Sequence, residues 1–297
     1  MVEKEQTAEE VLARQREKYD SNDAVKGTGL GNQGHKVGDR TVSNVNIYVD
    51  SDQMDNVQVP EKEDGIMLKK KRARDIVPVC YEGAYDPVPG GVVINWTNNQ
   101  GTAGFPARDS AGDDGMLTAA HIFFDGDPYD MSSCPAITDR DCYQSGQFLG
   151  EVQAAQTYED WAFVDDQPTD VSGFEDSIVS EPGTLRTYVS YNGLKDMKSR
   201  SESMKKKGVR TCTTYGIVQE VAISVELCGR TVNYFTRCSN DVAGGDSGSP
   251  HYRRRQPSGG GDYLDAIMVL SGTYNGNQAL GVPAYHLHDS RGYSFGV

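Results

Sequence analysis

Three short segments of the chain contain residue types that together could activate a nucleophile. Ser247 lies in GGDSGSP (244–250), His121 ends LTAAH (117–121), and Asp160 lies in YEDWAFVD (158–165). A serine hydroxyl attacks an amide carbonyl only when an imidazole accepts its proton and a carboxylate holds that imidazole in the correct tautomer. The three segments supply one candidate for each role, in the chain order His, Asp, Ser.

Glycines surround the candidate nucleophile. Gly245 and Gly248 permit the tight backbone that would present the Ser247 hydroxyl. The same turn would direct the N–H groups of Gly245 and Ser247 towards one point, as an oxyanion hole requires. Taken singly, each segment also has an ordinary interpretation. G-D-S-G occurs in common turns, a histidine after an apolar strand is often structural, and Asp160 is one of 43 acidic residues.

The elements that must position these residues read mainly as β-strands. From GGVVINW (90–96) onwards, short β-rich runs recur with Gly, Asn and Asp between them, without a convincing amphipathic helix. The 33 glycines and 12 prolines also favour many turns. We therefore predict an all-β sandwich or a pair of barrels. In it, GVPAYHL (281–287) is a strand, and residues 194–210, rich in Lys and Arg, form an exposed loop.

The first 85 residues have a sequence pattern that predicts both helix and strand. Their patterns predict a helix, a loop, a strand, and a pair of short strands around a basic turn, at residues 7–20, 21–40, 42–50 and 65–79 respectively. Thr7 and Glu10 fit a capping box at the start of the helix. We predict a small α+β leader or accessory segment over residues 1–85, followed by a β domain over residues 86–297.

Charge limits the partners of the chain. The basic run KKKRAR (69–74) could be a nucleic-acid or targeting patch, but a solvated strand or hairpin end is the more common setting. The net charge of −14 argues against a nucleic-acid partner and suggests adaptation to high salt, so that stability would rise between low and molar KCl. The longest apolar runs, such as residues 266–270, are too short to cross a bilayer.

Six cysteines leave the redox compartment open. Their pairing cannot be read from the sequence alone, although the closely spaced pairs Cys134/Cys142 and Cys228/Cys238 could close small loops. No C-x-x-C occurs, which argues against a zinc ribbon, and we predict no metal site. Disulfides would imply an oxidising compartment, yet MVEKEQTAEE lacks the apolar core of a signal peptide. Cytoplasmic is the default location, with an extracytoplasmic one still open.

Together, the three motifs resemble those of the chymotrypsin-like serine peptidases, in which TAAH contains the base, D-x-A-x-V the carboxylate and GDSG the nucleophile. The interval from His121 to Asp160 is 39 residues, the interval from there to Ser247 is 87, and 50 residues follow the serine. This spacing is similar to that of compact microbial members such as the streptogrisins, and the match covers about residues 90–297.

The resemblance implies a chymotrypsin-like double β-barrel that brings the three residues together. It also implies their roles, with His121 as the general base, Asp160 as the residue that orients it, and Ser247 as the nucleophile. The amides of Gly245 and Ser247 would form the oxyanion hole.

Other features of the resemblance concern substrate binding. VLSGT (269–273) is similar to the strand that pairs with the substrate peptide, which places Ser271 and Gly272 at the wall of the specificity pocket. Asp241 lies six residues before Ser247, where trypsin-like members keep an acid that binds a substrate Lys or Arg. A solvated loop acid is an equally good interpretation of Asp241.

The sequence departs from the family pattern near the serine. Ser249 replaces the last glycine of GDSGG, and Cys238 lies farther upstream than the cysteine usual in this region, so both interpretations of Asp241 stay open. The acid before the serine, Asp246, pairs in microbial members with an internal arginine. No such arginine can be identified from this sequence.

The sequence therefore predicts a serine endopeptidase that acts on a protein or peptide substrate through an acyl-enzyme intermediate, without a cofactor. One rival is a catalytically idle or latent chymotrypsin fold that serves as a binding module. Another is a peptidase that only cleaves off its own leader, near residues 80–90, and is inactive afterwards. A lipase-like esterase is disfavoured because those enzymes order their triad Ser, Asp, His. Neither the physiological substrate nor the oligomeric state follows from the sequence.

Overall fold

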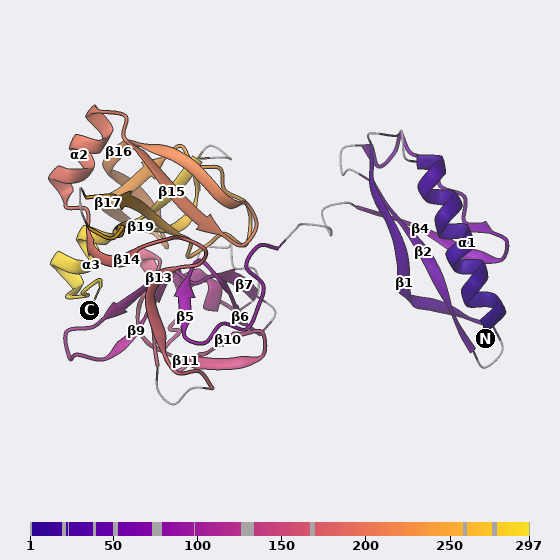
Figure 1. Cartoon of the computed structure of the whole chain (residues 1–297), viewed down its shortest axis with the longest axis horizontal. Coiled ribbons are helices and arrows are strands. Elements are labelled where there is room, and N and C mark those ends of the chain that lie inside the picture. The colour runs from indigo at the N-terminus through magenta and orange to yellow at the C-terminus, as the bar shows by residue number, and fades with distance from the viewer. Residues whose placement is uncertain are drawn as a thin grey trace. The chain divides into compact units, whose positions relative to one another are not determined.

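The computed structural model describes residues 2–19, 22, 24–37, 40–49, 53–72, 79–97, 99–125, 134–166, 170–257, 260–274 and 278–296. The chain divides into two compact units, Met1–Pro78 and Val79–Val297 (Figure 1). The domain boundary that we placed after residue 85 stays a prediction. Among the described residues, no helix is long and apolar enough to cross a membrane.

The described residues of the first unit include a four-stranded sheet and a helix. Its elements are α1 (Val2–Tyr19), β1 (Val25–Val37), β2 (Arg40–Val49), β3 (Lys62–Glu63) and β4 (Ile66–Arg72), and the strand order is β1-β2-β4-β3. Val11 and Leu12 of α1 share a buried cluster with Val45 of β2 and Leu68 of β4. Removal of these apolar side chains from water holds the helix on the sheet.

The sequence predictions for this unit are right for two segments and wrong for two. A helix and a strand, α1 and β2, occupy the segments predicted for them. The predicted capping box is wrong, because α1 begins at Val2 and Thr7 and Glu10 lie inside the helix. Residues 25–37, expected in a loop, form β1, because antiparallel pairing with β2 satisfies the backbone groups of this glycine-rich segment. The basic residues 69–72 extend β4 in parallel pairing with β2 instead of forming a turn. The rest of that predicted strand pair, residues 73–78, lies outside the described residues.

The second unit contains two curled β-sheets (Figure 1). The first sheet has the strand order β7-β6-β10-β11-β12-β9-β8. The second has the order β14-β19-β18-β15-β16-β17-β20 and closes on itself, because β19 also pairs with β20. Strands β5 and β13 form a short sheet of their own. This architecture confirms the prediction of a mainly β fold.

The strands of the second unit are, in chain order, β5 (Val88–Gly90), β6 (Val93–Trp96), β7 (Asn99–Thr102), β8 (Phe105–Arg108), β9 (Asp114–Thr118), β10 (Asp141–Gln144), β11 (Gln147–Gln156), β12 (Trp161–Asp165), β13 (Phe174–Ile178), β14 (Thr184–Tyr188), β15 (Ser203–Gly208), β16 (Cys212–Leu227), β17 (Arg230–Cys238), β18 (Pro250–Arg255), β19 (Tyr263–Tyr274) and β20 (Gln278–Pro283).

The prediction of an exposed loop over residues 194–210 is wrong. This segment contains the end of helix α2 (Tyr191–Ser199) and all of strand β15. The Ser190 hydroxyl caps the helix by accepting a hydrogen bond from the Gly193 amide. Leu194 and Met197, three residues apart on one helical face, are buried. The helix therefore forms because its few apolar residues meet the core, although its composition is that of a loop.

The predicted strand GVPAYHL is wrong in its second half. β20 ends at Pro283, and helix α3 (Ala284–Arg291) begins at the next residue. Proline has no N–H with which to continue a β ladder, so the sheet ends there. Ala284 and Leu287 of α3 are buried in the main apolar cluster.

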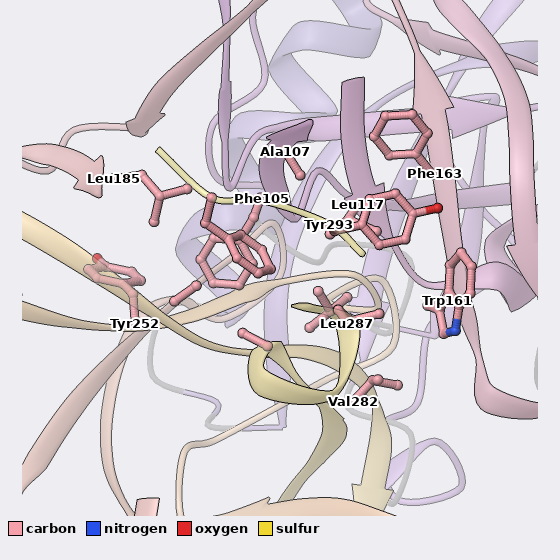
Figure 2. Close-up of a cluster of buried hydrophobic side chains, with 14 of the residues drawn as sticks. Phe105, Ala107, Leu117, Trp161, Phe163, Leu185, Tyr252, Val282, Leu287 and Tyr293 are labelled. Carbon is pink, nitrogen blue, oxygen red and sulfur yellow. The ribbon is translucent and has the colours of Figure 1, made fainter. Parts of the chain in front are cut away.

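That cluster joins the two sheets of the second unit (Figure 2). Phe105 and Phe163 enter it from the first sheet, and Tyr252 and Val282 from the second. Tyr293, which follows α3, packs against Phe163 with 5.0 Å between ring centroids. Close packing across this boundary fixes the position of one sheet against the other. The relative positions of residues that lie near this boundary on different sheets are therefore fixed.

Two disulfides cross the second unit, Cys80–Cys212 and Cys134–Cys228. The closely spaced pairs that we considered, Cys134/Cys142 and Cys228/Cys238, are therefore wrong. Cys142 and Cys238 are free, and each is buried in a different apolar cluster, where burial raises the pKa of the thiol. Spacing was misleading because the sheets bring together cysteines that are 132 and 94 positions apart.

Candidate active site

His121 lies at the end of a strand of the first sheet. β9 leads into the short 3₁₀ helix η3 (Ala120–Phe123), which contains the histidine. Every residue of η3 is buried, and only 4% of the His121 surface is exposed. The imidazole is therefore held in the interior, where its orientation depends on the polar groups beside it.

Asp160 is brought beside His121 by the pairing of β12 with β9. Asp160 directly follows the 3₁₀ helix η4 (Thr157–Glu159) and has a left-handed backbone with φ of 57°, and β12 follows at once. Ala162 of β12 lies opposite Thr118 of β9, so both candidate residues are at the same end of the strand pair. The Asp160 carboxylate accepts from His121 Nδ1 at 2.8 Å and from the His121 backbone N–H at 2.9 Å.

The turn before β18 supplies Ser247. Its Oγ lies 2.6 Å from His121 Nε2. Because an ionised carboxylate can only accept, Nδ1 carries the imidazole proton and Nε2 can accept the proton of the serine hydroxyl. The structure thus brings together all three residues that the sequence singled out. This arrangement can make the Ser247 hydroxyl a nucleophile.

The turn around Ser247 requires glycine at two positions. Gly245 and Gly248 have φ of 102° and 86°, values that residues with a Cβ rarely adopt. A Cβ on Gly248 would lie 2.1 Å from Thr118 Oγ1 and 2.2 Å from the Thr102 carbonyl oxygen. The first sheet therefore approaches the backbone of this turn closely. Gly245 and Ser247, whose amides we predict to form the oxyanion hole, flank Asp246 in the turn.

Asp246 pairs with Lys206 of β15, a residue that the sequence analysis missed. Lys206 Nζ lies 2.7 Å from Asp246 Oδ2, and both side chains are 0% exposed. The Asp246 carboxylate also accepts from the Arg210 backbone N–H at 2.8 Å and from the Thr211 hydroxyl at 2.7 Å. These contacts anchor the residue next to the nucleophile, so they hold the whole turn in one conformation.

Nothing in the sequence indicates that Lys206 is buried, because it is the middle one of three consecutive lysines, a pattern typical of a solvated segment. Side chains of a strand alternate between its two faces. Lys206 therefore meets Asp246, whereas Lys205 and Lys207 pair with Glu181 at 2.8 and 3.5 Å. Burial lowers the pKa of Lys206, and the Asp246 carboxylate opposes that effect by favouring the charged form.

Solved structures with a similar fold include two bacterial proteases. Thermobifida fusca protease A has a TM-score of 0.51 and 19% identity, with 72% of this chain and 100% of that chain covered. Nocardiopsis protease has a TM-score of 0.51 and 17% identity, with the same two shares covered. The second unit has the chymotrypsin-like serine protease fold. No family model and no curated protein matches the sequence.

In this chymotrypsin-like fold, Glu159 ties the segment of Asp160 to helix α3. Glu159 is 4% exposed and accepts hydrogen bonds from Trp161 Nε1 at 2.9 Å and from Arg291 Nε at 3.0 Å. His286 Nε2 lies 3.4 Å from the same carboxylate. Burial alone would raise the pKa of Glu159, but hydrogen bonds from its neighbours, above all His286, lower the pKa to about 2. η4, which directly precedes Asp160, is thereby fixed in place.

Of the residues predicted to bind substrate, Asp241 lies at the surface of the chymotrypsin-like fold, whereas Ser271 and Gly272 are half-buried. Asp241 is exposed, and its backbone carbonyl accepts from the Thr214 hydroxyl at 3.3 Å. The Thr211 hydroxyl oxygen, whose proton is donated to Asp246, lies at the same distance from this carbonyl. Ser271 and Gly272 lie on β19 where its pairing with β20 is irregular. A Cβ on Gly272 would meet no atom within 4 Å, so the space beside this part of β19 is open and could receive an extended peptide.

Proposed function

We propose that the chain is a serine endopeptidase that cleaves peptide bonds through an acyl-enzyme intermediate. One observation carries the proposal: the His121 imidazole lies 2.8 Å from the Asp160 carboxylate and 2.6 Å from Ser247 Oγ. Burying polar groups costs free energy unless they are paired, and a fold used only for binding would gain nothing from this network. The geometry therefore favours an enzyme over an idle binding module.

In the proposed reaction, His121 Nε2 accepts the hydroxyl proton while Ser247 Oγ attacks the substrate carbonyl. Asp160 stabilises the resulting imidazolium, and the amides of Gly245 and Ser247 donate to the oxyanion. His121 then gives the proton to the leaving amine, and the acyl chain stays on Ser247 as an ester. A water molecule, deprotonated by the same imidazole, hydrolyses the ester and restores the hydroxyl. These steps use only protein groups and water.

The proposal is tested by intact mass after treatment with a fluorophosphonate probe, which labels only activated serines. We expect one label per chain, in low salt or in molar KCl, and no label on Ser247→Ala. Ser199→Ala, which removes a serine at the end of α2, is the matched control and should label fully. An unlabelled wild-type chain in both salts would overturn the proposal and favour the idle fold. A single cut near residues 80–90, absent from Ser247→Ala, would instead identify a peptidase that releases only its leader.

We also propose that the enzyme prefers substrates with Lys or Arg before the cleaved bond, through Asp241. In support, Asp241 lies on the loop that leads to the nucleophile turn, and its side chain is accessible to a cationic partner. Asp241→Asn should lower kcat/KM for Lys and Arg peptides about tenfold or more while leaving neutral peptides unchanged. Asp196→Asn, an exposed acid on α2, is the control. Equal effects on cationic and neutral peptides would remove Asp241 from the specificity pocket.

A further inference from the structure

Thr102 is a buried residue of the first sheet that contacts the nucleophile turn of the second. It is the last residue of β7, and it is 0% exposed. Its backbone N–H donates to the Ser247 carbonyl at 2.8 Å. Its hydroxyl donates to the Gly245 carbonyl at 3.1 Å. Thr102 therefore binds the carbonyls on both sides of Asp246, one through its backbone and one through its side chain.

The same hydroxyl also accepts a hydrogen bond, from the Val209 backbone N–H at 3.3 Å. Val209 precedes Arg210, whose backbone N–H holds the Asp246 carboxylate. One hydroxyl group thus connects the first sheet, the nucleophile turn and the loop that anchors Asp246. A hydroxyl can donate and accept at once at this position, whereas an aliphatic side chain can do neither.

The Gly244–Gly245 peptide, whose N–H would donate to the oxyanion, needs such an anchor. Two consecutive glycines leave this backbone conformationally permissive. On one side of the peptide, the Ala243 carbonyl is held by the Asp246 N–H at 3.0 Å. On the other side, the Gly245 carbonyl is held by the Thr102 hydroxyl. Hydrogen bonds to the Ala243 and Gly245 carbonyls therefore fix the backbone on both sides of the Gly244–Gly245 peptide.

We propose that Thr102 is a positioning residue for the oxyanion hole, because its hydroxyl fixes the Gly245 carbonyl and so the direction of the Gly245 amide. The inference rests on the proposed peptidase function. An oxyanion donor contributes in the transition state and little in the substrate complex, so loss of its alignment should lower kcat and leave KM nearly unchanged. Removal of a whole oxyanion donor costs about 100- to 1,000-fold in kcat, and misalignment should cost about 10- to 100-fold.

The test compares Thr102→Val, which replaces the hydroxyl by a methyl group, with Thr102→Ser, which keeps the hydroxyl. Thr236→Val is the control for the same replacement at another buried site. The Thr236 hydroxyl has no hydrogen-bond partner among the residues that the structure describes. Steady-state hydrolysis of a peptide ester gives kcat and KM. Binding of a peptide aldehyde, whose hemiacetal oxyanion needs the hole, gives a second value to compare with kcat/KM.

We expect Thr102→Val to lose about 10- to 100-fold in kcat and a similar factor in aldehyde affinity, with an unchanged KM. Thr102→Ser and Thr236→Val should stay within about twofold of wild type. Equal kcat values for Thr102→Val and Thr102→Ser would overturn the proposal. So would a loss of kcat in Thr102→Val without a loss of aldehyde affinity.

Hydrogen exchange separates a failure of this inference from a failure of the proposed function. Amides of residues 243–249 should exchange faster in Thr102→Val than in Thr102→Ser, relative to residues 161–165 as an internal reference. If the wild type shows no Ser247-dependent hydrolysis, the peptidase proposal fails, and the exchange contrast still decides whether the hydroxyl holds the turn. Identical exchange of residues 243–249 in the two variants would refute the anchoring role.

Discussion

Replacing Lys206 with methionine should destabilise the second unit strongly, because the buried Asp246 carboxylate would lose its cationic partner. Lys206 and Asp246 are both 0% exposed, and their charged atoms lie 2.7 Å apart. Methionine fills a similar volume, so the change removes the charge and leaves little cavity. Asp246 would keep its hydrogen bonds from Arg210 and Thr211 but would lose its cation.

The magnitude follows from the burial of the pair. Removing one member of a buried ion pair costs about 3–5 kcal/mol, because the other charge stays unpaired in the interior. The hydrogen bonds that Asp246 retains reduce this cost, so we expect about 3 kcal/mol, or roughly a 150-fold change in the unfolding equilibrium.

Urea unfolding followed by tryptophan fluorescence measures this effect directly, since both tryptophans, Trp96 and Trp161, belong to the second unit. Lys198→Met, at an exposed position of α2, is the matched control and should stay within about 0.5 kcal/mol of wild type. The double variant Lys206→Met/Asp246→Asn should be less destabilised than the sum of the single variants. A loss below about 1 kcal/mol in Lys206→Met would refute the argument from the buried pair.

Three further changes test other parts of the second unit. Glu159 has a pKa lowered from 4.5 to about 2. Its contribution to the free energy of unfolding is therefore complete above pH 4.5 and is lost as the pH falls towards 2. Glu159→Gln should abolish this pH-dependent contribution of about 3 kcal/mol, as measured by unfolding at a series of pH values. Gly248→Ala places a Cβ 2.1 Å from the Thr118 hydroxyl oxygen and should abolish fluorophosphonate labelling. Gly272→Ala places a Cβ in open space, and its free energy of unfolding should equal that of the wild type. Replacing both Cys80 and Cys212 with alanine should lower the free energy of unfolding by about 2–4 kcal/mol, and an unchanged thermal midpoint would contradict a stabilising disulfide.

Much of the fold class could be predicted from local sequence, and the candidate triad from three motifs that together resemble those of a known family. His121 follows a short apolar strand, and Ser247 lies in a turn with glycine on both sides, so each has the backbone that its chemistry needs. Recurring β-rich runs predicted the sheets for the same reason, since strand propensity and turn residues act over a few positions. Predictions failed where a segment had the composition of a loop, as in β1 and α2.

The amino-acid sequence by itself determined which residues could perform the chemistry and their order along the chain. Only the tertiary structure decided their surroundings: the partner of Asp246, the pairing of the cysteines and the contacts of Thr102. Lys206 looks solvated within its lysine run, yet it is buried because β15 pairs with β18 and meets a carboxylate 40 positions away. Conformational preference is a local property, whereas burial and the partners of charges arise from contacts between distant segments. The three candidate residues could be identified because their motifs resemble those of a known family, whereas the residues that contact them become apparent only in the folded chain.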